Sequence, residues 1–162
     1  MPKRVVDIRF DSIDPESIEA VQAMEAYFAE LDRRFPTGFD PGDPKAEADH
    51  YRRPVGEFVI GSIDGAVVGC GAVQMIDASV GEVKRMWVNP DHRGLGVGRR
   101  TLVYLETVAS ELGATLVRLD TNAVLTEAVA MYLSSGYVEI DRYNDNPYAP
   151  VSYTHLTLPT KA

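Results

Sequence analysis

The stretch that decides the fold is RGLGVGR at residues 93–99, which follows EVKRMWV at residues 82–88 and the strand-breaking pair Asn89-Pro90. Its three glycines alternate with other residues between a predicted strand and a predicted helix. Because glycine lacks a Cβ atom, the backbone N–H groups of such a turn can converge on an anion. The N-terminus of the following helix adds unpaired N–H groups and the positive end of its dipole. The stretch therefore predicts a phosphate or pyrophosphate site, although a tight turn that only starts a helix is the alternative.

Basic residues gather at the same place. Arg93, Arg99 and Arg100 lie close together, whereas the whole chain of 162 residues has a formal net charge of −8. An acidic chain lacks the basic footprint that nucleic-acid binding needs, and its charge favours cationic substrates. A local cationic cluster on such a chain indicates a small anionic ligand.

The remaining sequence predicts one α/β domain, with a mixed sheet covered by helices. Predicted strands are residues 5–10, 58–63, 66–74, 82–88, 116–121 and 137–143, and predicted helices begin at Asp14-Pro15, begin after the glycine stretch, and cover residues 127–135. The first helix should end near Arg34, because Pro36 disfavours helical backbone at Phe35. Asp64-Gly65 predicts a tight hairpin, and residues 36–54 predict a long irregular loop.

Other phosphate-binding motifs fit the glycines less well. The dinucleotide fingerprint is Gly-x-Gly-x-x-Gly, and here the third glycine comes one residue earlier. Hairpins precede the stretch, where a dinucleotide-binding unit would have a parallel crossover. A dinucleotide-dependent oxidoreductase, with Asp120 as its ribose-binding acid, is thus a weaker alternative. A P-loop would need Gly-Lys-Ser/Thr, which does not follow.

Three motifs in order resemble the GNAT superfamily of N-acetyltransferases. Arg93-x-x-Gly96-x-Gly98 is similar to the coenzyme-A loop of that family, Arg/Gln-x-x-Gly-x-Gly/Ala. Residues 82–88 look like its fourth strand, and residues 128–137 look like its later Ala…Leu-Tyr…Gly-Phe motif. The resemblance covers residues 5–148. It implies a mixed, mostly antiparallel sheet of six to seven strands flanked by helices.

The resemblance also implies an activity and a co-substrate. The chain should move an acetyl group from acetyl-CoA directly to a primary amine of a small molecule, without a covalent enzyme intermediate. The lone cysteine, Cys70, lies outside every motif, as that mechanism allows. The implied cofactor contacts are Met86, Trp87, Val88, Arg93, Gly94, Leu95, Gly96, Val97, Gly98 and Arg99. No metal is implied.

Two side chains are candidates for proton transfer in that reaction. Tyr132 matches the general-acid tyrosine of the family, and a phenol of pKa about 10 can protonate a thiolate. The alternative is a core tyrosine on an amphipathic helix. Glu82 stands where some members carry a general-base glutamate, and its alternative is a solvated charge at a strand start. A catalytically inactive acyl-CoA-binding sensor is the competing function, and it would need neither residue.

Two places depart from the family pattern. Leu125 stands where many members have an asparagine, and Asn122 and Thr121 lie nearby and could replace it. The segment after residue 150 resembles a translated sequencing-library adapter, so we interpret residues 1–150 as the acetyltransferase domain and residues 151–162 as a non-native tail; a genuine short tail is the alternative. In the place of a lost seventh strand, part of residues 154–158 could pair with the sheet without contributing to function.

The expected setting follows from composition. The start of the chain lacks an apolar leader and no apolar run reaches the roughly 20 residues of a membrane helix, so a cytoplasmic protein is expected. The expected partner is a small-molecule amine, with no nucleic acid and no membrane. A homodimer is compatible with the sequence.

Overall fold

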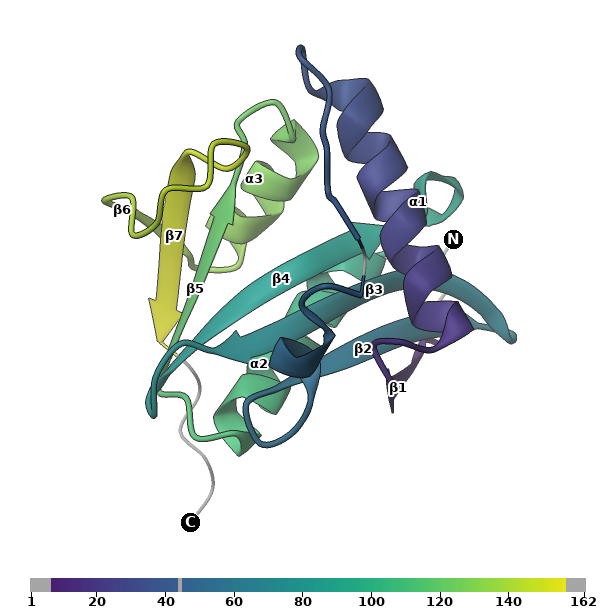
Figure 1. Cartoon of the computed structure of the whole chain (residues 1–162), viewed down its shortest axis with the longest axis horizontal. Coiled ribbons are helices and arrows are strands. Elements are labelled where there is room, and N and C mark those ends of the chain that lie inside the picture. The colour runs from purple at the N-terminus through teal and green to yellow at the C-terminus, as the bar shows by residue number, and fades with distance from the viewer. Residues whose placement is uncertain (1–6, 44, 157–162) are drawn as a thin grey trace, which may run out of the picture.

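The computed structural model describes residues 7–43 and 45–156, which form one seven-stranded sheet with three α-helices (Figure 1). The strands are β1 (Arg9–Ile13), β2 (Gly56–Ile63), β3 (Ala66–Met75), β4 (Val80–Val88), β5 (Leu116–Thr121), β6 (Val138–Ile140) and β7 (Val151–Leu156). The helices are α1 (Ile18–Arg34), α2 (Val97–Glu111) and α3 (Thr126–Ser134), with short 3₁₀ turns η1 (Ala48–Tyr51) and η2 (Pro90–His92). The strand order is β1-β2-β3-β4-β5-β7-β6, with β4 and β5 parallel and all other pairs antiparallel. The predicted mixed, mostly antiparallel α/β sheet is confirmed.

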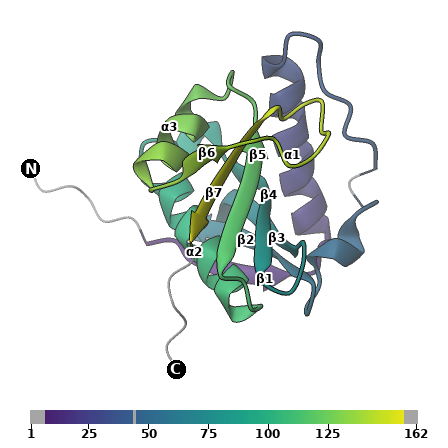
Figure 2. The ribbon, with the colours of Figure 1, turned by 90° about the vertical axis from the view of Figure 1, so that its left-hand side faces the viewer.

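The sheet has a core on each face, because side chains alternate between faces along a strand. Phe58 of β2 packs with Met24 and Phe28 of α1, whereas the next residue, Val59, packs with Leu105 of α2. Figure 2 shows α1 on one side of the strands and α2 and α3 on the other. None of the helices in the described part of the chain is long and apolar enough to cross a membrane.

The first helix begins later than predicted. Its N-cap is Ser17, whose Oγ accepts a hydrogen bond from the backbone N–H of Ala20 at 3.3 Å. The predicted cap, Asp14, instead accepts from the N–H of Glu16 and from Arg52, so its carboxylate holds the turn before the helix. The helix ends at Arg34 as predicted.

Two strands depart most from their predicted ranges, whereas β2, β3 and β4 differ by one or two residues at one end. In the predicted strand at residues 5–10, residues 5 and 6 lie outside the described part of the chain; β1 runs Arg9–Ile13, because its ladder with β2 extends to the pair Ile13↔Phe58. The predicted strand at residues 137–143 shortens to β6. Beyond it the chain turns into the molecule, where Tyr143 bonds Glu82 and Asn144 bonds Asp120.

The two central strands separate soon after they meet. Only Val80, Gly81 and Glu82 of β4 pair with β5, opposite Leu116, Val117 and Arg118 in turn. β4 then continues to Val88 while β5 diverges from it, as Figure 1 shows. Within residues 7–43 and 45–156, no strand pairs with this edge of β4 after Glu82, and the site described below lies there.

A β-bulge in β4 sets which side chains face that gap. The ladder to β3 pairs Ala72 with Lys84 and Cys70 with Trp87, so two residues of β4 stand opposite one of β3. Arg85 lies in the bulge with a left-handed φ of 58°. Such a bulge re-aims side chains on the bulged strand. Lys84 and Arg85 are consecutive residues and yet line the same cavity.

The C-terminal segment completes the sheet. β7 lies antiparallel between β5 and β6, and its Tyr153, opposite Leu119, is buried in the core beneath α3. The predicted pairing within residues 154–158 holds for residues 154–156; the strand begins earlier, at Val151, and residues 157 and 158 lie outside the described residues. That residues 151–162 are a non-native tail stays a prediction.

Removing residues 151–162 is expected to abolish the yield of soluble protein, because β5 would become an open edge and β6 would lose its partner. A milder variant, Tyr153→Ala, should lower the free energy of unfolding by about 3 kcal/mol through loss of a buried ring. Urea unfolding followed by circular dichroism measures the second effect, with Tyr153→Phe as control. A truncated chain that stays soluble with an unchanged melting temperature would show that β7 contributes nothing to stability.

Candidate active site

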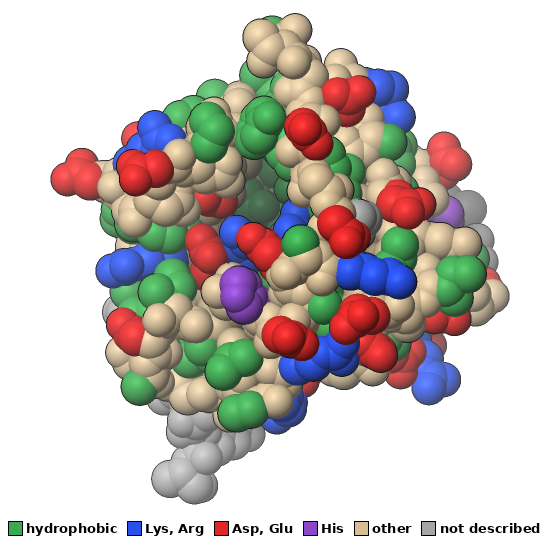
Figure 3. All heavy atoms as spheres, in the orientation of Figure 1, with side chains coloured by type: hydrophobic (Ala, Val, Ile, Leu, Met, Phe, Trp, Pro, Cys, Tyr) green, Lys and Arg blue, Asp and Glu red, His purple; other side chains and the backbone are tan. Residues whose placement is uncertain are grey.

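Three adjoining cavities lie along β4. The loop cleft, of about 470 Å³, lies between the end of β4, residues 93–99, α1 and α3. The central cavity, of about 120 Å³, shares Met86 and Tyr132 with it. The outer cavity, of about 620 Å³, shares Lys84, Arg85 and Asp120 with the central one and opens beside Glu82. Figure 3 shows a hollow near the centre of this face, with acidic and basic side chains gathered beside it.

The predicted cofactor contacts come together in the loop cleft, with one exception. The residues that line it include Met86, Trp87, Val88, Arg93, Gly94, Gly96, Val97, Gly98 and Arg99. Leu95 is 45% exposed and does not line the cleft. It belongs to the loop by sequence, but it is not part of the wall of the cleft.

The glycine loop presents open backbone at the start of α2. Gly94 and Gly96 have left-handed φ values of 84° and 78°, and Gly96 is the N-cap of the 15-residue helix. A Cβ atom added at either glycine would meet no atom within 4 Å, whereas one at Gly98 would come within 3.0 Å of the Met131 sulfur. Open backbone at the N-terminus of a long helix suits a phosphate group. The loop therefore fits the pyrophosphate of coenzyme A.

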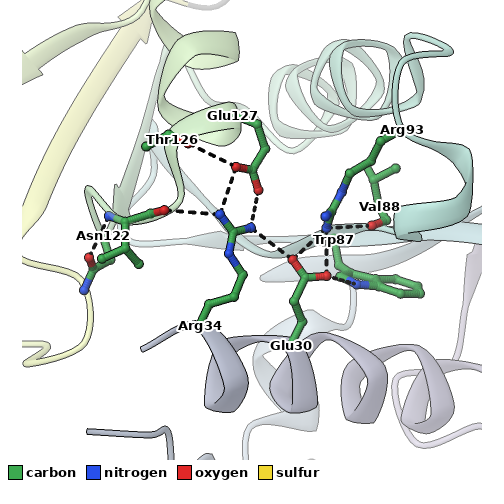
Figure 4. Close-up of polar contacts among 9 residues, drawn as sticks. Glu30, Arg34, Trp87, Val88, Arg93, Asn122, Thr126 and Glu127 are labelled. Carbon is green, nitrogen blue, oxygen red and sulfur yellow. Dashed lines mark hydrogen bonds and ion pairs between the residues drawn. The ribbon is translucent and has the colours of Figure 1, made fainter. Parts of the chain in front are cut away.

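The loop arginines are less free than the sequence suggests. Arg93 donates from one nitrogen to both carboxylate oxygens of Glu30 at 2.7 Å and to the carbonyl of Val88 at 3.2 Å (Figure 4). Arg99 donates to the hydroxyl of Ser134 at 2.6 Å. Glu30 of α1 thus compensates the charge of Arg93 and ties it to the end of β4.

Another arginine, Arg34, connects two walls of the loop cleft. Arg34, at the end of α1, pairs with both carboxylate oxygens of Glu127 in the first turn of α3, and with Glu30 at 3.2 Å (Figure 4). The hydrogen bond from Arg34 lowers the pKa of Glu127 to about 2. No motif in the sequence marks Glu30, Arg34 or Glu127, which sequence reasoning missed.

Tyr132 of α3 lies at the boundary between the loop cleft and the central cavity, and it lines both. Its side chain is 7% exposed, and among the described residues its hydroxyl has no hydrogen-bond partner. Burial raises the pKa of the phenol, so it stays protonated at neutral pH. The rings of Tyr137 and Tyr153 support it, with centroids at 5.9 and 6.3 Å. The geometry places a protonated phenol at the inner end of the loop cleft.

Glu82 lies in the wall of the outer cavity, and at 7% exposure it is not the solvated charge that the sequence allowed. The hydroxyl of Tyr143 donates to its Oε2 at 2.6 Å, and the ammonium of Lys84 stands 3.8 Å from its Oε1. Burial raises the pKa of Glu82, and Lys84 and Tyr143 offset only part of that effect. A carboxylate with a raised pKa suits proton abstraction near neutral pH.

Asn122 and Thr121, which could replace the family asparagine, both line the central cavity. Leu125 caps α3 without a side-chain hydrogen bond and lines the loop cleft and the central cavity. The side chain of Asn122 accepts from the N–H of Val124 and donates to the carbonyl of Tyr148. Its amide therefore holds the chain around the central cavity.

Comparisons with known proteins agree with this geometry. Residues 24–137 match the model of the acetyltransferase (GNAT) family. The chain is 36% identical over 112 residues to an IAA acetyltransferase of Azospirillum brasilense, covering 65% of this chain and 72% of that protein.

Solved structures share the fold. A putative acyl-CoA N-acyltransferase of Klebsiella pneumoniae has a TM-score of 0.73 at 25% identity, covering 93% of this chain and 98% of the other. An aminoglycoside 6′-N-acetyltransferase, solved with coenzyme A, has a TM-score of 0.66 at 13% identity, covering 95% and 99%, and supports the fold alone. With the family match, these findings displace the oxidoreductase alternative. The chain belongs to the acetyltransferase (GNAT) family and is an acyltransferase with acetyl-CoA as its co-substrate.

Proposed function

We propose that this enzyme transfers the acetyl group of acetyl-CoA directly to the primary amine of a small molecule, with Tyr132 as general acid and Glu82 as general base. The observation that carries the proposal is that the three cavities adjoin and share wall residues. Tyr132 lines both the loop cleft and the central cavity, and Glu82 lines the outer cavity, which adjoins the central one. A donor and an acceptor can therefore approach each other through the gap in the sheet.

The donor side is built from backbone. The amides of residues 93–99 would hold the pyrophosphate, and the unpaired edge of β4 at residues 86–88 would hold the pantetheine arm. Acetyl-CoA supplies an activated thioester. Apolar side chains such as Met86 and Met131 line the same cleft and would exclude water from that group.

The acceptor side must remove a proton. An amine is mostly an ammonium ion at neutral pH and attacks only after it loses a proton. Glu82 can take that proton, directly or through a water molecule, and its raised pKa keeps it a stronger base than an exposed glutamate. Tyr143 fixes the carboxylate by its hydrogen bond.

The leaving thiolate must gain a proton, and the position of Tyr132 in the wall of the loop cleft supports it as the donor. Direct transfer also agrees with the state of Cys70. The thiol is fully buried, bonds the carbonyl of Arg85 at 3.2 Å, and has its pKa raised to about 12 by burial. A thiol in that state is a poor nucleophile, so an acetyl-cysteine intermediate is not part of the proposal.

Free-thiol release from acetyl-CoA, measured across a panel of small primary amines, tests the proposal. Amine-dependent release is the expected result. Binding of acetyl-CoA without release for any amine would support the alternative of an inactive sensor and overturn the proposed function.

Changing Glu82 to glutamine should depress kcat/KM by about 10²-fold at pH values above the pKa of Glu82 and below that of the substrate amine, because there the wild type has an ionised base while the amine is still protonated. At high pH the free amine is abundant and the variant should approach the wild type. The pH profile of thiol release measures this. Glu57→Gln is the matched control, since Glu57 is equally buried but lines none of the cavities described above. A profile that scales down uniformly would remove Glu82 from the base role.

A further inference from the structure

The outer cavity places opposite charges side by side on one strand. Glu82 and Lys84 are two residues apart on β4, so both side chains lie on the same face, and both line the cavity. The nitrogen of Lys84 stands 3.8 Å from the nearer carboxylate oxygen of Glu82. That distance exceeds the length of a hydrogen bond, so the two groups are neighbours with room for other partners.

Of the two described basic residues that line this cavity, Lys84 is the one whose ammonium makes no hydrogen bond in the described structure. Arg85 is already committed, because it donates to Glu47 at 3.0 Å and to the Tyr51 hydroxyl at 3.3 Å and lies 4.8 Å from the ring centre of Phe28. Among the described residues Lys84 has the distant ion pair with Glu82 and a charge interaction with Glu47, and its side chain is 24% exposed. A half-buried ammonium with spare donors attracts an anionic group.

The other carboxylates of the cavity already have partners. Glu47 is paired with Arg85, Asp120 accepts from Asn144 at 2.7 Å, and Asp40 accepts from the N–H of Gly42. Glu82 and Lys84 are therefore the pair best placed to recognise the reacting end of an acceptor.

A simple amine would be poorly matched to this pair. Its ammonium, placed at Glu82, would lie beside the like charge of Lys84 in a partly desolvated cavity, where repulsion is strong. If the substrate also carried a carboxylate next to its amine, that carboxylate would attract Lys84 and offset the repulsion between the two ammonium groups.

Resting on the proposed function, we infer that the acceptor is a zwitterion of the amino-acid type, whose amine lies at Glu82 and whose carboxylate pairs with Lys84. The cavity of about 620 Å³ leaves space for a side chain beyond these two groups. Phe39 and Tyr148 form part of the wall around that space. Their rings are in edge-to-face contact, with centroids 4.6 Å apart.

Matched substrates test the inference. Thiol release is compared for free amino acids and for the corresponding α-carboxamides, which keep the amine and lose the negative charge. For the wild type we expect kcat/KM at least about tenfold higher for the acids. The amine of an amide is the less basic, so protonation alone would favour the amide and cannot produce this preference.

Variants of Lys84 test whether this residue causes the preference for acids over amides. Lys84→Gln should raise KM for the acids much more than for the amides. Loss of the Lys84 charge also raises the pKa of Glu82, which changes kcat for acids and amides alike, so the ratio of kcat/KM between acid and amide is the readout. Lys84→Arg should keep most of the preference. Lys45→Gln is the control, because Lys45 is exposed and does not line the cavity. The wild-type comparison needs no variant and stands if Lys84→Gln fails to fold.

Two failures are distinguishable. Equal or better turnover of the amides would overturn the zwitterion while leaving the proposed function intact. Absence of thiol release with every amine and amino acid would overturn the proposed function, and this inference with it.

Discussion

Replacing Tyr132 with phenylalanine is expected to lower kcat by about 10²–10⁴-fold while the Kd for acetyl-CoA stays near that of the wild type. The change removes one hydroxyl, which has no hydrogen-bond partner among the described residues, so folding loses little. The ring that packs against Tyr137 and Tyr153 remains. Steady-state thiol release gives kcat, and calorimetric titration gives the affinity.

Tyr153→Phe is the matched control for that experiment. Tyr153 is buried in the same aromatic cluster but lines none of the three cavities, so its hydroxyl should not matter for turnover. A Tyr132→Phe enzyme with the kcat of the wild type would make Tyr132 a core residue, as the sequence alone allowed.

Gly96→Asp and Gly98→Asp should each abolish binding of acetyl-CoA. An added carboxylate about 4 Å from a phosphate costs ~4 kcal/mol at an effective dielectric constant of 20, which weakens binding about a thousandfold. At Gly96 no protein atom would clash with the new Cβ, so the effect there comes from charge, lost space for the ligand and the left-handed backbone. At Gly98 the new side chain would also press on Met131 of α3. Calorimetric titration with acetyl-CoA measures both.

Gly65→Asp is a control that separates the effect of backbone strain from the effect on acetyl-CoA binding. Gly65 has a φ of 82° and open space around it, as Gly96 does, but it lies in the β2–β3 hairpin and does not line the loop cleft. It should lose stability without losing affinity. Unchanged affinity in both loop variants would remove the cofactor site from residues 93–99.

Local signals in the sequence predicted most of the fold. Asp64-Gly65 forms the hairpin between β2 and β3, and Gly113, with a left-handed φ of 107°, follows the end of α2. Each signal depends on residues a few positions apart. The start of α1 was wrong for the same reason: Asp14 is a good cap by itself, but Arg52, distant in the sequence, binds its carboxylate.

The polar partners of the site could not be predicted in this way. Arg93 and Glu30 are 63 positions apart, and Tyr143 and Glu82 are 61 positions apart. In α1, Glu30 reads as one more charged residue of an amphipathic helix. Only the packing of α1 against β4 shows that Glu30 faces inward. There it forms an ion pair with Arg93, the first arginine of the motif. The sequence therefore predicted the loop itself better than it predicted the charge that a ligand would meet there.

The short contact between β4 and β5 divides the sheet into two ladders, β1–β4 and β5–β7–β6, joined through three residue pairs. Weakly joined parts of a protein open locally at a lower free energy than the whole. A ligand in the loop cleft would contact β4 of the first ladder and α3, whose Tyr132 packs against Tyr153 of the second ladder, so it would connect the two ladders. Binding of the acetyl donor should therefore slow amide hydrogen exchange even in β7, a strand that does not line the loop cleft, and the enzyme would be most vulnerable to proteolysis after it has released coenzyme A.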